Sequence, residues 1–282
     1  LTPARYTMSS KLTGGGTLNL EVNYVRGVLN GDWSEFTGTI NITAELTAST
    51  AEFRVANSFG YAGATLFANN NVIITQNGSG NPMLIGALGG TSGSVVGPGN
   101  DTSSGRNFNI GYNNQNATFA GRILADGVNV ITKVGTGNWT LTGANTYSGG
   151  TIVDGGTLTV NNTSGTGTGT GSVTVNTGAT LAGTGIISGA TTINSGATIA
   201  PGSGGIGTLT INSSVTLAAG STTRIEINKT SNTMDFLDAS GALTFGGNLI
   251  VTNLSGTLAD GDSFKIFDAA SYGGSFSSMT LP

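Results

Sequence analysis

The side chains that most often carry enzyme chemistry are scarce in this sequence. It contains no histidine and no cysteine, which excludes Ser-His-Asp and Cys-His nucleophile systems and removes the commonest zinc ligands. Nucleotide-binding glycine motifs need a strand–loop–helix setting. Helix-forming Lys, Glu and Arg are few, because charged residues make up only 9% of the chain. The sequence therefore predicts no catalytic, metal-binding or cofactor-binding residue, and no cofactor.

Carboxylate pairs offer the best alternative for an enzyme, because a polysaccharide hydrolase needs two carboxylates about 5–9.5 Å apart. A polysaccharide lyase would instead need a basic residue beside acidic calcium ligands. The pairs close together in the sequence are Asp235 with Asp238, Asp260 with Asp262, and Arg224 with Glu226. Asp260 and Asp262 lie in an Ala-Asp-Gly-Asp-Ser turn that could bind calcium weakly. We interpret all three pairs as solvated turns or surface ion pairs.

Aromatic side chains are the second kind of candidate binding group, since sugar rings stack on exposed aromatic rings. Four of them could form the platform of a glycan-binding module: Trp33, Trp139, Tyr147 and Tyr272. The alternative, which we favour, is that these rings pack inside the protein or shield its ends and corners.

The elements that must position any such site follow a repeated pattern from Ser172 to Gly220. Asn176, Asn194 and Asn212 recur at one constant interval, and the aliphatic residues around them keep the same spacing. A fixed period in short β-rich units is typical of a solenoid. We predict that the three asparagines stack in an amide ladder along the axis. The alternative is that each asparagine caps its own turn.

The overall composition supports strands joined by tight turns. The 282 residues include 48 glycines, and 37% are hydrophobic, with Thr, Val and Ile suited to pleated surfaces and Gly and Asn to turns. The net charge of −4 argues against a nucleic-acid partner. No apolar run approaches the length of about 18–20 residues that a membrane helix needs, so we expect no transmembrane segment.

Residues 131–160 carry the most specific motif. Their core reads Leu-Thr-Gly-Ala-Asn-Thr-Tyr-Ser-Gly-Gly-Thr from Leu141 to Thr151, followed by Gly-Gly-Thr-Leu at 155–158. This segment resembles the autotransporter-associated β-strand repeat, also called the passenger-associated transport repeat. The resemblance implies a parallel β-helix in a secreted or cell-surface bacterial protein. It points to a right-handed helix.

These patterns predict an all-β fold, a single parallel β-helix solenoid that spans residues 1–282 in about 12–15 coils. We favour the right-handed form. Hexads of aliphatic residues at 175–217 keep the left-handed form open. We expect an arm or cap at 1–16, a bulging loop at 97–107, 18-residue coils at 172–220 and less regular coils or a cap at 229–282. Residues 161–171 should form a polar edge that buries nothing.

The functional expectation is a structural or adhesive β-helix protein, outside the cell or on the outer surface of a bacterium. We expect a signal peptide to have been removed before Leu1. The low charge favours self-association, end to end or side by side, into an extracellular fibre or surface layer. Surface glycans or another cell surface are the other expected partners. The alternatives are a glycan-binding module and, less favoured, a polysaccharide lyase or hydrolase.

Overall fold

The structure is a computed structural model. It describes residues 10–22, 25–29, 31–44, 51–56, 61–69, 71–77, 82–97, 107–124, 130–202 and 204–282. Most of the predicted arm or cap at 1–16 and of the predicted loop at 97–107 lies outside these residues. The described part contains strands and no helix, and hence no helix that could cross a membrane.

Twenty-eight strands follow one another along the described chain. They are β1 (Thr17–Val22), β2 (Val25–Leu29), β3 (Thr39–Ala44), β4 (Ala51–Ala56), β5 (Tyr61–Asn69), β6 (Val72–Asn77), β7 (Met83–Gly90), β8 (Val95–Val96), β9 (Phe108–Ile110), β10 (Ala117–Phe119), β11 (Arg122–Ile123), β12 (Ile131–Lys133), β13 (Asn138–Leu141), β14 (Thr151–Val153), β15 (Thr157–Val160), β16 (Val173–Val175), β17 (Thr180–Gly183), β18 (Ile186–Ile187), β19 (Thr191–Ile193), β20 (Thr198–Pro201), β21 (Thr208–Ile211), β22 (Val215–Leu217), β23 (Thr222–Asn228), β24 (Thr233–Met234), β25 (Phe236–Phe245), β26 (Asn248–Asn253), β27 (Phe267–Gly274) and β28 (Ser278–Thr280).

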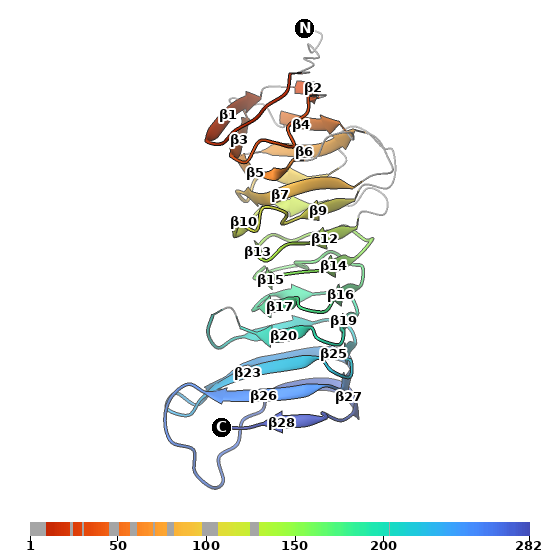
Figure 1. Ribbon diagram of the computed structural model, residues 1–282. Helices are drawn as coiled ribbons and strands as arrows, with labels where there is room; N and C mark the ends of the chain where they lie inside the picture. The colour runs from red at the N-terminus through yellow and green to blue at the C-terminus, as the bar shows by residue number, and fades with distance from the viewer. Residues whose placement is uncertain are drawn as a thin grey trace.

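The strands stack as the coils of a parallel β-helix, which confirms the predicted fold class (Figure 1). On one side of the rod twelve strands form an uninterrupted parallel ladder: β1, β3, β5, β7, β10, β13, β15, β17, β20, β23, β26 and β28. At a spacing of about 4.8 Å between neighbours, this ladder is roughly 50 Å long. The handedness of the coil stays a prediction.

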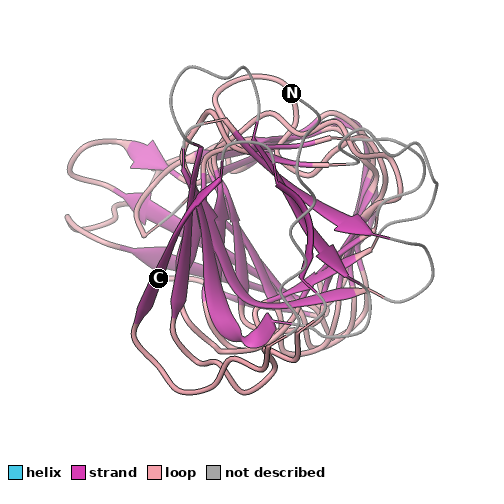
Figure 2. Ribbon diagram, turned by 90° about the horizontal axis from the view of Figure 1, so that it is seen from above, coloured by secondary structure: helices cyan, strands magenta, loops and turns pink. Residues whose placement is uncertain are grey.

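Each coil has two further sides, and the three sides surround a common core (Figure 2). The second side contains β9, β12, β14, β16, β19 and β22. The third side contains β2, β4, β6, β8 and β11, and later β18, β21 and the first half of β25. In strands such as β13, β17, β20 and β26 alternate residues point inward, as the pleat requires. These residues form columns that run along the axis.

One inward column shows how strictly the stacking is kept. It consists of Ile85, Ile110, Lys133, Val153, Val175, Ile193 and Leu217, each in register with the next. All seven side chains are buried. A β-branched or aliphatic residue fills each place except one, because Lys133 takes the position between Ile110 and Val153. Burial of these columns is the main favourable term for the fold.

The predicted period holds for one step and then changes. Val175 pairs with Ile193, as the period predicts, but Ile193 pairs with Leu217 and not with Ile211, which stands at the same interval again. The corner glycines change in the same way: Gly178 N–H donates to Gly196 O and Gly196 N–H donates to Gly220 O, both at 2.9 Å. The longer coil holds six more residues, which turn back near Gly202 through a short antiparallel contact with Gly183.

The amide ladder is therefore shorter than predicted. Asn194 Nδ2 donates to Asn176 Oδ1 at 2.8 Å, and Asn176 Nδ2 donates to the carboxylate of Asp154 one coil earlier. The expectation that Asn212 continues this ladder is wrong. Its backbone N–H bonds to Ile187 O, whereas the N–H of Ala218 bonds to Ile193 O, beside Asn194. The longer coil has moved Asn212 to another side of the rod.

Residues 161–171 also differ from the prediction, because they do bury side chains. Thr166 and Thr168 are buried where the chain crosses the third side between β15 and β16. The hydroxyl of Thr166 donates to Gly169 O at 2.8 Å and accepts the N–H of Ser188 at 3.1 Å. Local hydrogen bonds of this kind let a polar residue enter the interior at little cost.

Candidate functional site

The motif at 141–151 forms a buried corner between β13 and β14. Asn145 is almost fully buried there, and its side chain bridges two coils. Its Oδ1 accepts the N–H of Ile123 at 2.7 Å, and its Nδ2 donates to the carbonyl of Gly167. The third side has no regular strand at this level, so the amide of Asn145 takes the place of a peptide group in the ladder.

Tyr147 closes the same corner from inside the rod. Its hydroxyl lies 2.7 Å from the hydroxyl of Thr151, which donates in turn to Thr168 O at 3.2 Å. The ring packs against Gly169, where a Cβ atom would lie 2.9 Å from Tyr147 Cγ. Burial raises the pKa of the Tyr147 hydroxyl well above its ordinary value, so the group stays neutral. Asn145, Tyr147 and Thr151 are thus structural residues of the corner.

Lys133 is a buried cation in the same region. Its ammonium group donates to three carbonyls, those of Val134 at 2.7 Å, Gly135 at 3.2 Å and Gly155 at 3.1 Å. Burial lowers the pKa of Lys133 to about 8, because the charged form loses its water shell. Because its ammonium group bonds to carbonyls of both turns, Lys133 links the turn at Val134 and Gly135 to the turn at Gly155 in the next coil.

The geometry of this corner agrees with the motif that defines it in sequence. Residues 131–160 match the family model described as passenger-associated-transport-repeat. The chain carries a passenger-associated-transport-repeat. Within this repeat, Lys133, Asn145, Tyr147 and Thr151 all direct polar atoms at the backbone or at one another. The repeat therefore helps successive coils to stack. The polar atoms of these four side chains bond within the rod.

A longer stretch of the chain is similar to a much larger protein. Over 102 residues, 36% of this chain, the sequence is 35% identical to the adhesin BmaC autotransporter of Brucella suis biovar 1 (strain 1330). The matched stretch covers 3% of that protein. The match to the repeat model and the similarity to this adhesin both support the resemblance to the autotransporter-associated repeat that the sequence motif indicated.

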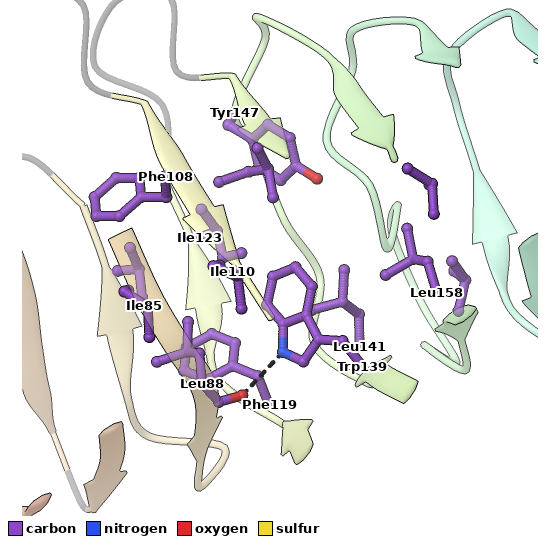
Figure 3. Packing of buried hydrophobic residues seen from close by; sticks show 14 of the residues in the cluster. Ile85, Leu88, Phe108, Ile110, Phe119, Ile123, Trp139, Leu141, Tyr147 and Leu158 are labelled. Carbon is purple, nitrogen blue, oxygen red and sulfur yellow. Dashed lines mark hydrogen bonds between the residues drawn. The ribbon is translucent and has the colours of Figure 1, made fainter. Parts of the chain in front are cut away.

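Three of the four aromatic residues considered for a glycan platform are buried. Trp33, Trp139 and Tyr147 have at most 2% of their surface exposed. The indole of Trp139 lies inside the rod and donates to Leu88 O at 2.9 Å (Figure 3). Tyr272 is 54% exposed in β27 and stacks on Phe245 with ring centres 5.9 Å apart. A platform built from all four rings is therefore wrong, and the favoured packing role is confirmed for the three buried rings.

The carboxylate pairs do not converge on a site. Asp235 is buried, and its two oxygens accept the N–H groups of Gly207 at 2.9 Å and Glu226 at 2.8 Å. Burial raises the pKa of Asp235 to about 6 despite these two bonds. Asp238 lies in β25, where its register partners are Thr210 and Asp268. The interpretation of Asp235 as part of a solvated turn or surface ion pair is therefore wrong, because the residue is buried with both carboxylate oxygens bonded to the main chain.

The pair Asp260 and Asp262 forms a turn, as interpreted from the sequence. Asp262 accepts the N–H of Ala259 at 2.8 Å and forms an ion pair with Lys229. These contacts lower the pKa of Asp262, with the Lys229 contact the larger cause. Among the described residues, no group of three or more acidic side chains is placed to hold a metal ion.

Arg224 and Glu226 lie outward on β23, on either side of the buried Ile225. Together with Asp235 they line a small cavity of about 150 Å³ beside the turn at Gly202. The Arg224 guanidinium and the Glu226 carboxylate lie on the same outward face of β23, as expected for a surface pair. This arrangement offers no paired acid and base across a substrate cleft.

A polar groove near the N-terminal end was missed in the sequence. It has a volume of about 640 Å³ and is lined by glycines, threonines and the segment Tyr112, Asn113 and Gln115. The sequence pattern places Tyr112 only in the alternation that begins at Phe108, yet its ring is 41% exposed. The run Gly-Tyr-Asn-Asn-Gln-Asn at 111–116 was the available signal, because it is turn chemistry interrupting a strand pattern.

Proposed function

We propose that this chain is a rigid, non-catalytic β-helical segment of a secreted or cell-surface bacterial protein, with a structural and adhesive role. The observation that carries the proposal is the uninterrupted ladder of twelve parallel strands from β1 to β28, around a main apolar core with a smaller second cluster in β23 and β26. The passenger repeat and the similarity to part of an adhesin autotransporter support the location and the role. Because each coil stacks on the next, a rod of this kind keeps side chains on distant coils at a fixed distance from one another.

The absence of enzyme activity is part of this proposal. The sequence has neither histidine nor cysteine, and both oxygens of the buried Asp235 are engaged by backbone N–H groups. A polysaccharide lyase or hydrolase would need carboxylates that converge across a cleft. Incubation of the purified chain with plant and bacterial polysaccharides should release no reducing or unsaturated ends. Release that depends on Asp235 or Asp262 would overturn this part.

The shape and the adhesive role can be tested together. Small-angle X-ray scattering of the purified chain should give the pair-distance distribution of an elongated rod with a thin cross-section. Beads coated with the chain should adhere to bacterial or host cell surfaces above the level of albumin-coated beads. A compact, isometric particle would contradict the structural role, and beads that adhere no better than albumin would contradict the adhesive role.

We also propose that copies of the chain associate with one another. The C-terminal coil supports this proposal. Met279 stands in the inward column that contains Trp139 and Leu249, yet it is 63% exposed. Leu281 is exposed near it, Tyr272 is exposed on another side of the same coil, in register with Leu243, and a cavity of about 320 Å³ opens next to Leu281. We propose that this surface is covered in the native protein, by a second copy of the chain or by a following coil, since uncovered strand edges and core residues promote pairing.

Sedimentation velocity provides the test of self-association. The wild-type chain should form concentration-dependent oligomers between micromolar and millimolar protein. Met279→Lys should remain monomeric, whereas Leu254→Lys, an equally drastic change at another exposed apolar residue away from the column, should not. If the wild-type chain stays monomeric over this whole range, the proposal that it forms fibres is wrong. The proposal that it is a rigid rod would still stand.

A further inference from the structure

The polar groove near the N-terminal end has the composition of a sugar-binding surface. Its volume is about 640 Å³, and none of the described residues that line it is charged. Thr17, Thr39 and Thr65 lie in register on β1, β3 and β5, so their hydroxyl-bearing positions are one coil apart. Tyr112, Asn113 and Gln115 complete the wall. The groove thus offers a row of hydroxyls beside an aromatic ring and two amides.

The segment that carries Tyr112 is fixed from both sides. Asn113 Nδ2 donates to Thr65 Oγ1 at 3.1 Å, reaching across Gly86, where a Cβ atom would come within 2.8 Å of that nitrogen. On the other side, Asn114 accepts the N–H of Thr136 at 2.8 Å. These contacts hold the segment in place before any ligand arrives, which lowers the entropy cost of binding.

The chemistry of the groove selects the class of ligand. A nucleic acid or an acidic polymer would require cationic groups, and the part of the lining that the structure describes has none. An extended peptide would need an open strand edge, but β3 and β5 are each paired on both sides. Neutral sugars match what is present, because their hydroxyls pair with hydroxyls and amides while their apolar ring faces pack on an aromatic ring.

We propose that this groove binds a neutral polysaccharide that lies along the rod, with a sugar ring against Tyr112 and successive units over Thr65, Thr39 and Thr17. The length of one sugar unit in an extended glycan is of the same order as the coil spacing of about 4.8 Å, so successive units can lie over successive coils. This inference rests on the proposed adhesive function and gives it a ligand class. The residues involved are distinct from the aromatic set considered from the sequence.

Isothermal titration calorimetry with the full chain provides the test. The probes are cellohexaose, maltohexaose, laminarihexaose and N-acetylchitohexaose, with oligogalacturonate as the acidic comparison. At least one neutral probe should bind and the acidic probe should not. Tyr112→Ala and Gln115→Ala should each weaken that binding about tenfold or more, whereas Tyr112→Phe should stay within about threefold because the ring is kept.

Leu254→Ala is the control, since it removes an exposed apolar side chain at the opposite end of the rod and should leave binding unchanged. The inference is overturned if no neutral probe binds, or if Tyr112→Ala binds as the wild type does. Preferred binding of an extended peptide or of the acidic probe would also overturn it. A rod-shaped, adherent chain that binds none of the neutral sugars would remove this inference and leave the proposed function standing.

Discussion

The indole nitrogen of Trp139 donates a hydrogen bond of 2.9 Å to the carbonyl of Leu88, far earlier in the chain. The two residues belong to coils that are not adjacent, since β10 lies between β7 and β13. The side chain therefore spans the interior and ties three successive coils together (Figure 3). Stacking in a solenoid is otherwise a property of nearest neighbours.

Truncation of Trp139 should be among the most damaging single changes. Trp139→Ala is expected to lower the free energy of unfolding by about 3–5 kcal/mol through the cavity that it leaves. Trp139→Phe should cost about 1–2 kcal/mol, because the Leu88 carbonyl loses its donor. Urea titration followed by circular dichroism measures both. Tyr272→Ala should shift the midpoint little, and an Ala variant of Trp139 as stable as that control would contradict the bridging role.

Asn145 gives a second prediction, specific to the repeat. Asn145→Ala leaves the N–H of Ile123 and the carbonyl of Gly167 without their partners, which should cost about 2–4 kcal/mol. Asn145→Asp should rescue little, because a carboxylate accepts the N–H but cannot donate to Gly167. Hydrogen exchange should be faster at Ile123 in Asn145→Ala, whereas Asn145→Asp should keep the protection of that N–H, because its carboxylate still accepts it. Asn194→Ala is the control, because its amide bond to Asn176 is only partly buried.

Lys133 predicts a gain of stability at alkaline pH. Its pKa is about 8 in the folded protein and about 10.4 in an unfolded chain. Between these values the unfolded state binds more protons, so stability rises with pH, by up to about 3 kcal/mol over the whole window. Thermal melts from pH 8 to pH 9.5 should show the rise. Lys133→Met fills the same column position and should make that part of the profile flat.

A persistent rise in the Lys133→Met variant would assign the effect to another group. The window stops at pH 9.5 because buried tyrosines act in the opposite direction at higher pH. Burial raises the pKa of Tyr61 and of Tyr147 far above the ordinary value. Their unfolded forms lose protons first, which destabilises the fold above about pH 10.

Asp235 predicts the reverse dependence on the acidic side. Its pKa is raised from 3.8 to about 6 by burial. Between these two values the folded state binds more protons, so the contribution of Asp235 falls as pH rises, by about 3 kcal/mol in total. Asp235→Asn should remove this part of the profile between pH 4 and pH 6. Equal pH profiles for the variant and the wild type would show that Asp235 titrates normally.

The fold could be predicted from the sequence because it depends on spacing and composition. Val175 and Ile193 keep the spacing that the sequence repeats, and the turns between them are rich in glycine, so the solenoid could be predicted from periodicity and composition. The position of Asn212 could not be predicted in the same way. Its local sequence matches that of Asn194, and only the pairing of whole coils reveals that the preceding coil is six residues longer.

The candidate groove was invisible for a related reason. Thr17, Thr39, Thr65 and Tyr112 are far apart in the chain, and the coil lengths that align them vary, because the step from Thr39 to Thr65 is longer than the step from Thr17 to Thr39. A period search finds equal steps and misses such unequal ones. The burial of Trp139 was easier to foresee, since it alternates with outward Asn138 and Thr140 on a strand.

The lengthening of the coil that follows Ile193 has an evolutionary consequence. Ile193 and Leu217 remain in one inward column although six residues have been added between their coils, because the surplus is placed at a corner. In-frame duplication or loss of a few corner residues would therefore change the length of a single coil. The strands of the other coils would keep their register. A gene for this architecture can vary locally without passing through an unfolded intermediate protein.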